Sequence, residues 1–88
     1  MSIKVQISPL FSQATNNQRI AEVNGNTVAE GLTHLVKQFP KFKLFDNDGK
    51  LLSYLGVSVN GELANPDELD KPIKDGDELS VVLMFDGG

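Results

Sequence analysis

Apolar and polar residues alternate at the start of the chain, over residues 3–7, and this period of two predicts a half-buried strand. A second strand is predicted over residues 19–23, where Ile20 falls out of the alternation and suggests a bulge. The polar stretch 12–18 lies between them. We therefore expect the two strands to pair as a hairpin with a long, open loop.

The segment that begins at Thr27 predicts one amphipathic helix of about three turns. Its first residues form a capping box, in which the threonine side chain accepts a backbone N–H and Glu30 reaches back. The apolar residues that follow form a stripe about 100° wide and consist of Val28, Leu32, Leu35, Val36 and Phe39. Pro40 ends the helix. Gly31 flanks the stripe and suggests a close approach of the helix to the sheet.

The middle of the chain is less regular. Phe42, Leu44 and Phe45 are apolar without a clear period, and we expect a short helical turn there that packs at the edge of the sheet. Residues 46–49 resemble the start of a calcium loop, but Val57 stands where that loop requires a glutamate. The sequence therefore predicts a plain turn.

Asn60-Gly61 is a typical two-residue hairpin turn, and it follows the apolar strand predicted over 57–59. A loop comes next, in which Pro66 can start a single helical turn. The last strand is predicted from Glu78 to Met84 or Phe85.

Both faces of this last strand carry apolar residues. Leu79, Val81 and Leu83 share one face, and the other carries Ser80, Val82 and Met84. A central strand, or one whose outer face meets a partner, explains this pattern. Parallel pairing with the strand at 3–7 is then expected, and the order of the elements predicts a small α+β domain.

The composition is that of a single small globular domain of 88 residues. Twelve acidic residues against eight basic ones give a net charge of −4, so the basic excess of a nucleic-acid-binding protein is missing. No apolar run is long enough to cross a membrane or to form a signal peptide. We expect a cytoplasmic protein that binds neither nucleic acid nor membranes.

The sequence offers little catalytic chemistry. It contains no cysteine, and its single histidine, His34, is expected on the solvated side of the helix. Asp75, Asp77 and Glu78 surround a glycine turn and are expected to be structural. No metal-ligand cluster and no phosphate-binding loop occur. We therefore expect no metal, no bound cofactor and no enzymatic activity, and the chain is better interpreted as a substrate or carrier.

The sequence ends in Gly87-Gly88, whose only reactive group is the α-carboxyl. Glycines let a thin, extended segment enter a narrow channel in which any Cβ would clash. A frayed terminus without function is the alternative.

Residues 69–81, followed by the glycine pair at 87–88, resemble the ThiS/MoaD family of ubiquitin-like sulfur carriers. The turn at 59–62 and the helix entry at 27–32 are also similar to that family, as is Phe39-Pro40 at the helix end. The resemblance covers nearly the whole chain and is most specific from Val57 onward.

The resemblance implies a β-grasp fold, with a mixed sheet of four to five strands covered by one main helix and a short extra helical turn. Residues 1–85 would form a single domain and residues 86–88 a flexible tail. An ATP-dependent activating enzyme would adenylate the carboxylate of Gly88. Sulfur would then replace the adenylate and give a thiocarboxylate, which donates sulfur to a biosynthetic acceptor such as a synthase or a large subunit.

The family resemblance also implies where partners bind. Gly88 would bear the sulfur, Gly87 would give access to the channel, and weaker candidates for partner contacts are Val82, Met84, Phe85 and Asp86. A core position is an equal alternative for Val82. The acceptor stays open between a molybdopterin-type pathway, with the chain as the small subunit of a synthase, and amino-acid or cofactor sulfuration. Two other functions remain: a protein modifier conjugated through Gly88, and a plain interaction domain.

Overall fold

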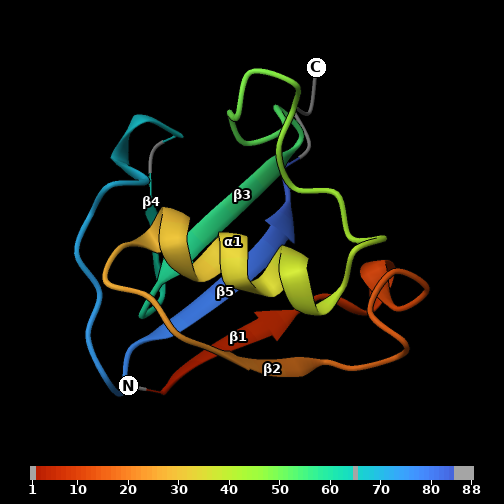
Figure 1. Cartoon of the computed structure of the whole chain (residues 1–88), viewed down its shortest axis with the longest axis horizontal. Coiled ribbons are helices and arrows are strands. Elements are labelled where there is room, and N and C mark those ends of the chain that lie inside the picture. The colour runs from red at the N-terminus through yellow and green to blue at the C-terminus, as the bar shows by residue number, and fades with distance from the viewer. Residues whose placement is uncertain (1, 65, 85–88) are drawn as a thin grey trace.

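A mixed, five-stranded sheet carries the fold (Figure 1). The structure is a computed structural model that describes residues 2–64 and 66–84. The order of the strands across the sheet is β2-β1-β5-β3-β4. Their bounds are β1 Ile3–Ile7, β2 Ile20–Val23, β3 Leu55–Val59, β4 Glu62–Ala64 and β5 Glu78–Leu83.

The last strand, β5, lies at the centre of the sheet, as its apolar faces predicted. It pairs in parallel with β1, where Val5 is opposite Leu79, and antiparallel with β3, where Val57 is opposite Val81. The strand ends at Leu83, slightly earlier than predicted. Phe85 lies outside the described residues, so the boundary between domain and tail stays a prediction.

The bulge predicted at Ile20 is wrong. The ladder between β1 and β2 is regular, and Ile20 lies opposite Gln6 while Ala21 lies opposite Val5. Ala21 and Val23 face the core, whereas 56% of the surface of Ile20 is exposed. Because alternation across a strand is strict, the larger side chain points to solvent and the small alanine points inward.

The helix α1 (Val28–Gln38) covers one face of the sheet (Figure 1). Thr27 Oγ1 accepts a hydrogen bond of 3.2 Å from the backbone N–H of Glu30, as the capping box predicted. The Glu30 carboxylate accepts from the backbone N–H of Asn26 at 2.9 Å, one residue before the cap. The helix ends before Phe39 and Pro40, where the sequence predicted its end.

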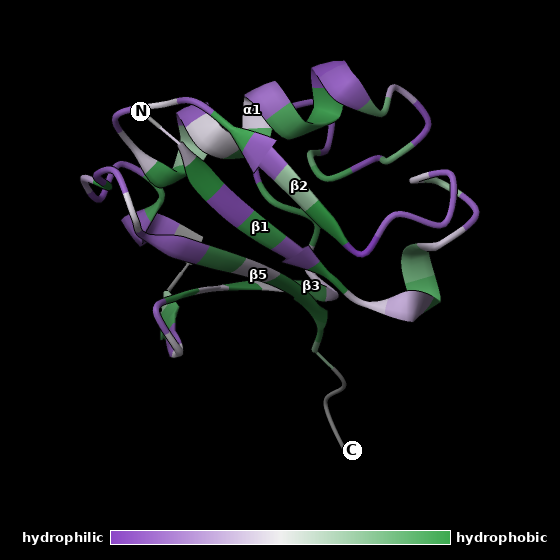
Figure 2. Cartoon of the chain, turned by 90° about the horizontal axis from the view of Figure 1, so that it is seen from below, coloured by the Kyte–Doolittle hydropathy of each residue, from purple (hydrophilic) through white to green (hydrophobic). Residues whose placement is uncertain are grey.

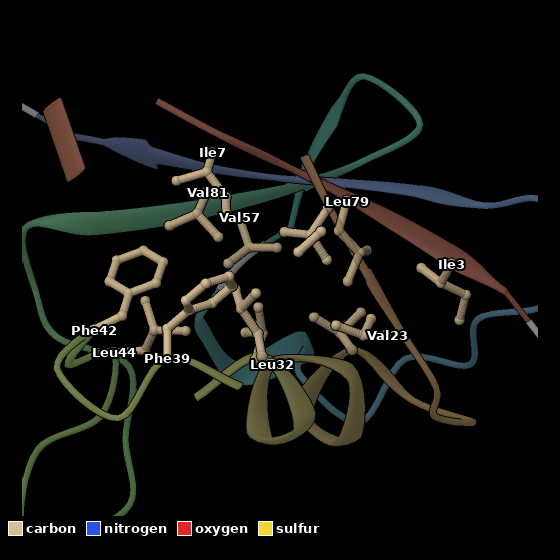
Figure 3. Close-up of a cluster of buried hydrophobic side chains, with 14 of the residues drawn as sticks. Ile3, Ile7, Val23, Leu32, Phe39, Phe42, Leu44, Val57, Leu79 and Val81 are labelled. Atoms are coloured by element: carbon tan, nitrogen blue, oxygen red, sulfur yellow. The ribbon is translucent and has the colours of Figure 1, made fainter. Parts of the chain in front are cut away.

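The core lies between α1 and the sheet (Figure 3). Gly31 lies where the helix approaches the sheet: a Cβ added there would be 3.4 Å from both Ile73 Cδ1 and Leu79 Cδ1. The close approach predicted for this glycine is therefore confirmed. The fully buried side chains include Ile3, Val5, Val23, Val28, Leu32, Leu35, Leu44, Val57, Leu79 and Val81.

The segment between α1 and β3 differs from its prediction. Phe42, Leu44 and Phe45 do not form a helical turn; Phe42 and Leu44 are buried in the core, and Phe45 forms an isolated bridge with Leu51. The Phe42 ring packs against Phe11, with 5.1 Å between the ring centroids. This long-range contact joins the segment to the start of the chain, and the local backbone hydrogen bond from Leu52 N–H to the Leu44 carbonyl, 2.9 Å long, flanks the bridge.

The short helical turns lie elsewhere in the chain. They are 3₁₀ turns, η1 at Pro9–Phe11 and η2 at Pro66–Glu68, and the second was predicted from its proline. The turn predicted at 46–49 is present, and the Asp46 carboxylate closes it by accepting the backbone N–H groups of Asp48 and Lys50.

Asp77 joins two turns at the end of the sheet where β5 begins. Its carboxylate accepts the side-chain N–H of Asn60 at 3.0 Å and the backbone N–H of Lys74 at 2.8 Å. These two hydrogen bonds, with a smaller contribution from the Lys74 charge, lower the pKa of Asp77 below its ordinary value of 3.8. The structural role predicted for this acidic turn is confirmed.

We expect Asp77→Asn to lower the melting temperature at pH 7. The folded protein holds Asp77 at a lowered pKa, so the ionised form stabilises the fold above the ordinary pKa of 3.8, and this contribution is lost as the pH falls through the folded pKa. The difference from wild type should therefore shrink below pH 3.8. Melting curves followed by circular dichroism at pH 7 and at low pH measure this difference in melting temperature. Asp70→Asn removes the same charge from an exposed site and should show no such change.

Candidate functional site

The outer face of the sheet, opposite α1, is the candidate site. Figure 2 shows α1 along one side of the sheet only. Since Leu79 and Val81 of β5 point into the core, Ser80 and Val82 point outward. In β3 the outward positions are Gly56, opposite Val82, and Ser58, opposite Ser80.

An apolar patch lies on this outer face, beside the end of β5. We call it the outer patch and define it as Leu63, Val82 and Met84. Leu63 and Met84 are 54% and 43% exposed, and Val82 is half-buried. Scattered exposed apolar residues are ordinary, but a cluster on one face is typical of a protein contact. The outer patch is therefore the surface that best fits a partner.

The backbone of Met84 is fixed although it lies past the end of β5. Its N–H donates a 2.8 Å hydrogen bond to the carbonyl of Tyr54, which extends the pairing of β5 with β3 by one further rung. The Tyr54 side chain is 53% exposed. The chain thus leaves the described part of the sheet directly beside the outer patch.

The rest of the outer face is polar. Gln6, Ser80 and Ser58 form a row across the centre of the sheet, with Ile20 and Leu63 at its two ends. Beyond that row, toward the start of β5, the side-chain N–H of Gln6 donates to the Glu78 carboxylate at 2.8 Å. The outer face is therefore polar and charged toward the start of β5 and apolar toward its end, near Met84.

The structure brings together two of the predicted site residues, Val82 and Met84. Val82 lies on the outer face and not in the buried core cluster. The other four predicted site residues, Phe85, Asp86, Gly87 and Gly88, lie outside the described residues.

Two residues of this region were missed from the sequence. Leu63 belongs to the outer patch, and Gly56 lies beneath Met84. Alternation along β3 was the available signal, because Gly56 and Ser58 are the small residues between Leu55, Val57 and Val59. A glycine inside a strand indicates a close approach of another group.

His34 has a structural role. Its Nδ1 accepts the backbone N–H of Asn24 at 2.7 Å, and one helical turn further on Gln38 donates its side-chain N–H to the carbonyl of Glu22 at 2.6 Å. Both side chains of α1 thereby bind the outer edge of β2. Among the described residues, no three or more acidic or histidine side chains form a group that could hold a metal ion. Within the same residues, no helix is long and apolar enough to cross a membrane.

The fold defines a class: a ubiquitin-like β-grasp domain, here with an exposed apolar patch beside the end of its last strand. The family model described as the ThiS family matches residues 9–88, and the chain belongs to this family. No curated protein sequence matches the chain.

Several solved structures are similar to the whole chain. SAMP1 from Haloferax volcanii is 27% identical, with 100% of each chain covered and a TM-score of 0.84. A chain of the BexX/CysO complex from Amycolatopsis orientalis is 26% identical, with 98% of this chain and 99% of that chain covered and a TM-score of 0.84.

A chain from the complex of molybdopterin-converting factor subunits 1 and 2 of Helicobacter pylori is similar in fold. It is 21% identical, with 100% of each chain covered and a TM-score of 0.64. Two of these three neighbours thus come from complexes of two proteins. The β-grasp fold predicted from the sequence is confirmed.

Proposed function

We propose that this protein is a sulfur carrier that receives sulfur at the carboxylate of Gly88 and passes it to a biosynthetic acceptor. The observation that carries the proposal is the match to the ThiS family, which extends over residues 9–88 and so includes both final glycines. The sequence agrees with this role, because it contains no cysteine nucleophile and the proposal uses the carboxylate of Gly88 instead.

The proposed reaction has two steps, and a partner enzyme binds the ATP that the first step consumes. The Gly88 carboxylate oxygen attacks the α-phosphorus of ATP, pyrophosphate leaves, and an acyl-adenylate forms. Hydrogen sulfide, as HS⁻, then attacks the acyl carbon, AMP leaves with the bonding electron pair, and the proton goes to water, giving the thiocarboxylate. The first step is needed because a free carboxylate is a poor electrophile until its oxygen becomes part of a good leaving group.

The outer patch would dock the activating enzyme and afterwards the sulfur-accepting protein. Leu63, Val82 and Met84 offer apolar area, and the burial of apolar area is the dominant favourable contribution to most protein association. Because the patch lies beside the point where β5 ends, a docked partner can receive residues 85–88 in a channel next to the contact. One surface would therefore serve both docking and delivery.

Intact-mass spectrometry tests the proposal directly. The full chain is incubated with MgATP, sulfide and a ThiS/MoaD-type activating enzyme from the same organism. We expect a gain equal to the mass difference between sulfur and oxygen, together with release of pyrophosphate. Omitting ATP is the control and should leave the mass unchanged. An unchanged mass with each such activating enzyme of the organism would contradict the proposal.

A protein modifier is the second candidate, favoured by the 27% identity to SAMP1, a protein of the small archaeal modifier type. The same adenylate would then be attacked by the amine of a lysine on another protein. The two functions differ in their products. Mass spectrometry of tryptic peptides from cells would find Gly88 in isopeptide linkage to lysines for a modifier, and a free thiocarboxylate for a carrier.

A further inference from the structure

Gly56 is buried in the central part of the sheet, at a position where β-strands usually carry branched or aromatic side chains. Glycine weakens a strand interior, because it has no side chain to pack and gains more freedom on unfolding. Its backbone does not require glycine, since its φ is not in the left-handed region that side chains avoid. The reason for this glycine must therefore be steric.

The space that a side chain would take at Gly56 is filled by Met84. A Cβ added to Gly56 would lie 2.7 Å from Met84 Cγ and 2.8 Å from Met84 Sδ, closer than such atoms approach each other in proteins. The same Cβ would lie 3.3 Å from Leu63 Cδ1. The Met84 side chain thus folds back across the sheet and rests directly on the Gly56 backbone.

Met84 is consequently held at two points. Its backbone N–H is bound to the Tyr54 carbonyl at 2.8 Å, and its side chain lies over Gly56 beside Leu63. It is the last residue that the structure describes, and residues 85–88 follow it in the sequence. A residue fixed by both backbone and side chain fixes the point at which the described part of the chain ends.

We propose that Gly56 is a positioning residue for the tail: it provides the seat for Met84 and so fixes the origin of residues 85–88 relative to the docked partner. This inference rests on the proposed function, in which Gly88 is the activated residue. Four residues then separate the seat from the reaction, and a fully extended segment of that length spans at most about 14 Å. When the partner's channel holds so short a segment extended, a change in the origin of the tail passes on to the reacting carboxylate.

The packing of Met84 on Gly56 leads to a kinetic prediction. In Gly56→Ala the Met84 side chain is displaced, and we expect kcat/KM for adenylation to fall about 10- to 100-fold, mainly in kcat, because small displacements of reacting groups have effects of that size. Gly31→Ala is the matched control, because it makes the same exchange on α1, on the other side of the sheet, where the added Cβ would be 3.4 Å from its nearest neighbours. It should stay within about twofold of wild type. The rate is measured as pyrophosphate release.

A double mutant shows whether the effect passes through Met84. Met84→Ala removes the side chain that needs the seat, so adding Gly56→Ala in that background should change kcat/KM by less than about twofold. If the two substitutions lower kcat/KM by factors that simply multiply, the effect of Gly56→Ala does not pass through Met84 and the proposal is contradicted. Thermal unfolding of every variant shows whether the domain stays folded under assay conditions.

Two structural readouts do not depend on sulfur chemistry. The chain has two methionines, so a ¹³C-methyl spectrum identifies the Met84 signal by its loss in Met84→Ala. In Gly56→Ala we expect this signal to shift and the Met84 amide to exchange faster with solvent. If the Met84 methyl signal and the exchange rate of the Met84 amide are both unchanged, Gly56 does not hold the Met84 side chain in place, whatever the activity of the protein.

The possible results separate the inference from the proposed function. A loosened Met84 with an unchanged rate of adenylation would overturn the positioning role and leave the sulfur carrier intact. Wild-type protein that no activating enzyme adenylates would overturn the proposed function, and with it the positioning role in that reaction. The spectroscopic readouts would in that case still decide whether Gly56 seats Met84.

Discussion

A chain that lacks Gly88 is expected to gain no sulfur at all. The variant still ends in a glycine carboxylate, but that group lies one residue, about 3.5 Å, closer to the domain. Reaction with ATP requires the attacking oxygen within about 3–3.5 Å of phosphorus and in line with the leaving group, so a shift of this size removes productive geometry. Intact mass after incubation with MgATP, sulfide and the activating enzyme measures the effect.

The control for this deletion is the stability of the domain. Gly88 follows Met84, the last described residue, by four residues, and we expect the unfolding midpoint in urea to equal that of the full chain. A variant with one added glycine after Gly88 tests the opposite displacement and should also lose activity. Full sulfur gain by either variant would contradict Gly88 as the reacting residue.

Leu79→Ala is expected to cost about 2–5 kcal/mol of the free energy of unfolding. Leu79 has no exposed surface, lies on the central strand β5, and packs near the helix at Gly31. Neighbouring strands on both sides and α1 above limit collapse into the cavity, which favours the upper part of that range. Small domains have about 5–15 kcal/mol in total, so this one change removes a large share.

Val82→Ala is the matched control on the same strand. Its side chain is half-buried on the outer face, so truncation leaves no enclosed cavity, and the loss should be about 1 kcal/mol or less. Urea unfolding followed by circular dichroism measures both variants, with the midpoint compared at a constant slope. Equal losses for the two variants would contradict the assignment of inner and outer faces.

Elements that depend on local pattern were predictable from the sequence. The capping box at Thr27 and the apolar stripe define α1 because both act within the helix itself. The central position of β5 followed from its two apolar faces, and the hairpin at Asn60-Gly61 followed from the turn residues. The resemblance that rests on these segments led to the correct family.

The errors lie where long-range packing decides the structure. The segment around Phe42 is fixed by its ring contact with Phe11, and no local period shows such a contact. Ile20 was misjudged because the inward residue beside it is only an alanine, Ala21, which hides the alternation. Gly56 was missed for the same kind of reason, since its partner Met84 lies on another strand's extension.

The hydrogen bonds of His34 and Gln38 at the β2 edge affect how readily a second chain can pair with that edge at high protein concentration. An open edge strand presents free N–H and C=O groups, on which a further chain can add itself and start a growing aggregate. Two of these groups, the Glu22 carbonyl in β2 and the N–H of Asn24 directly after it, are already occupied by side chains of α1. The opposite edge, β4, has only three residues. The β2 edge therefore offers a further chain fewer free backbone groups than a bare strand would, and the β4 edge is short.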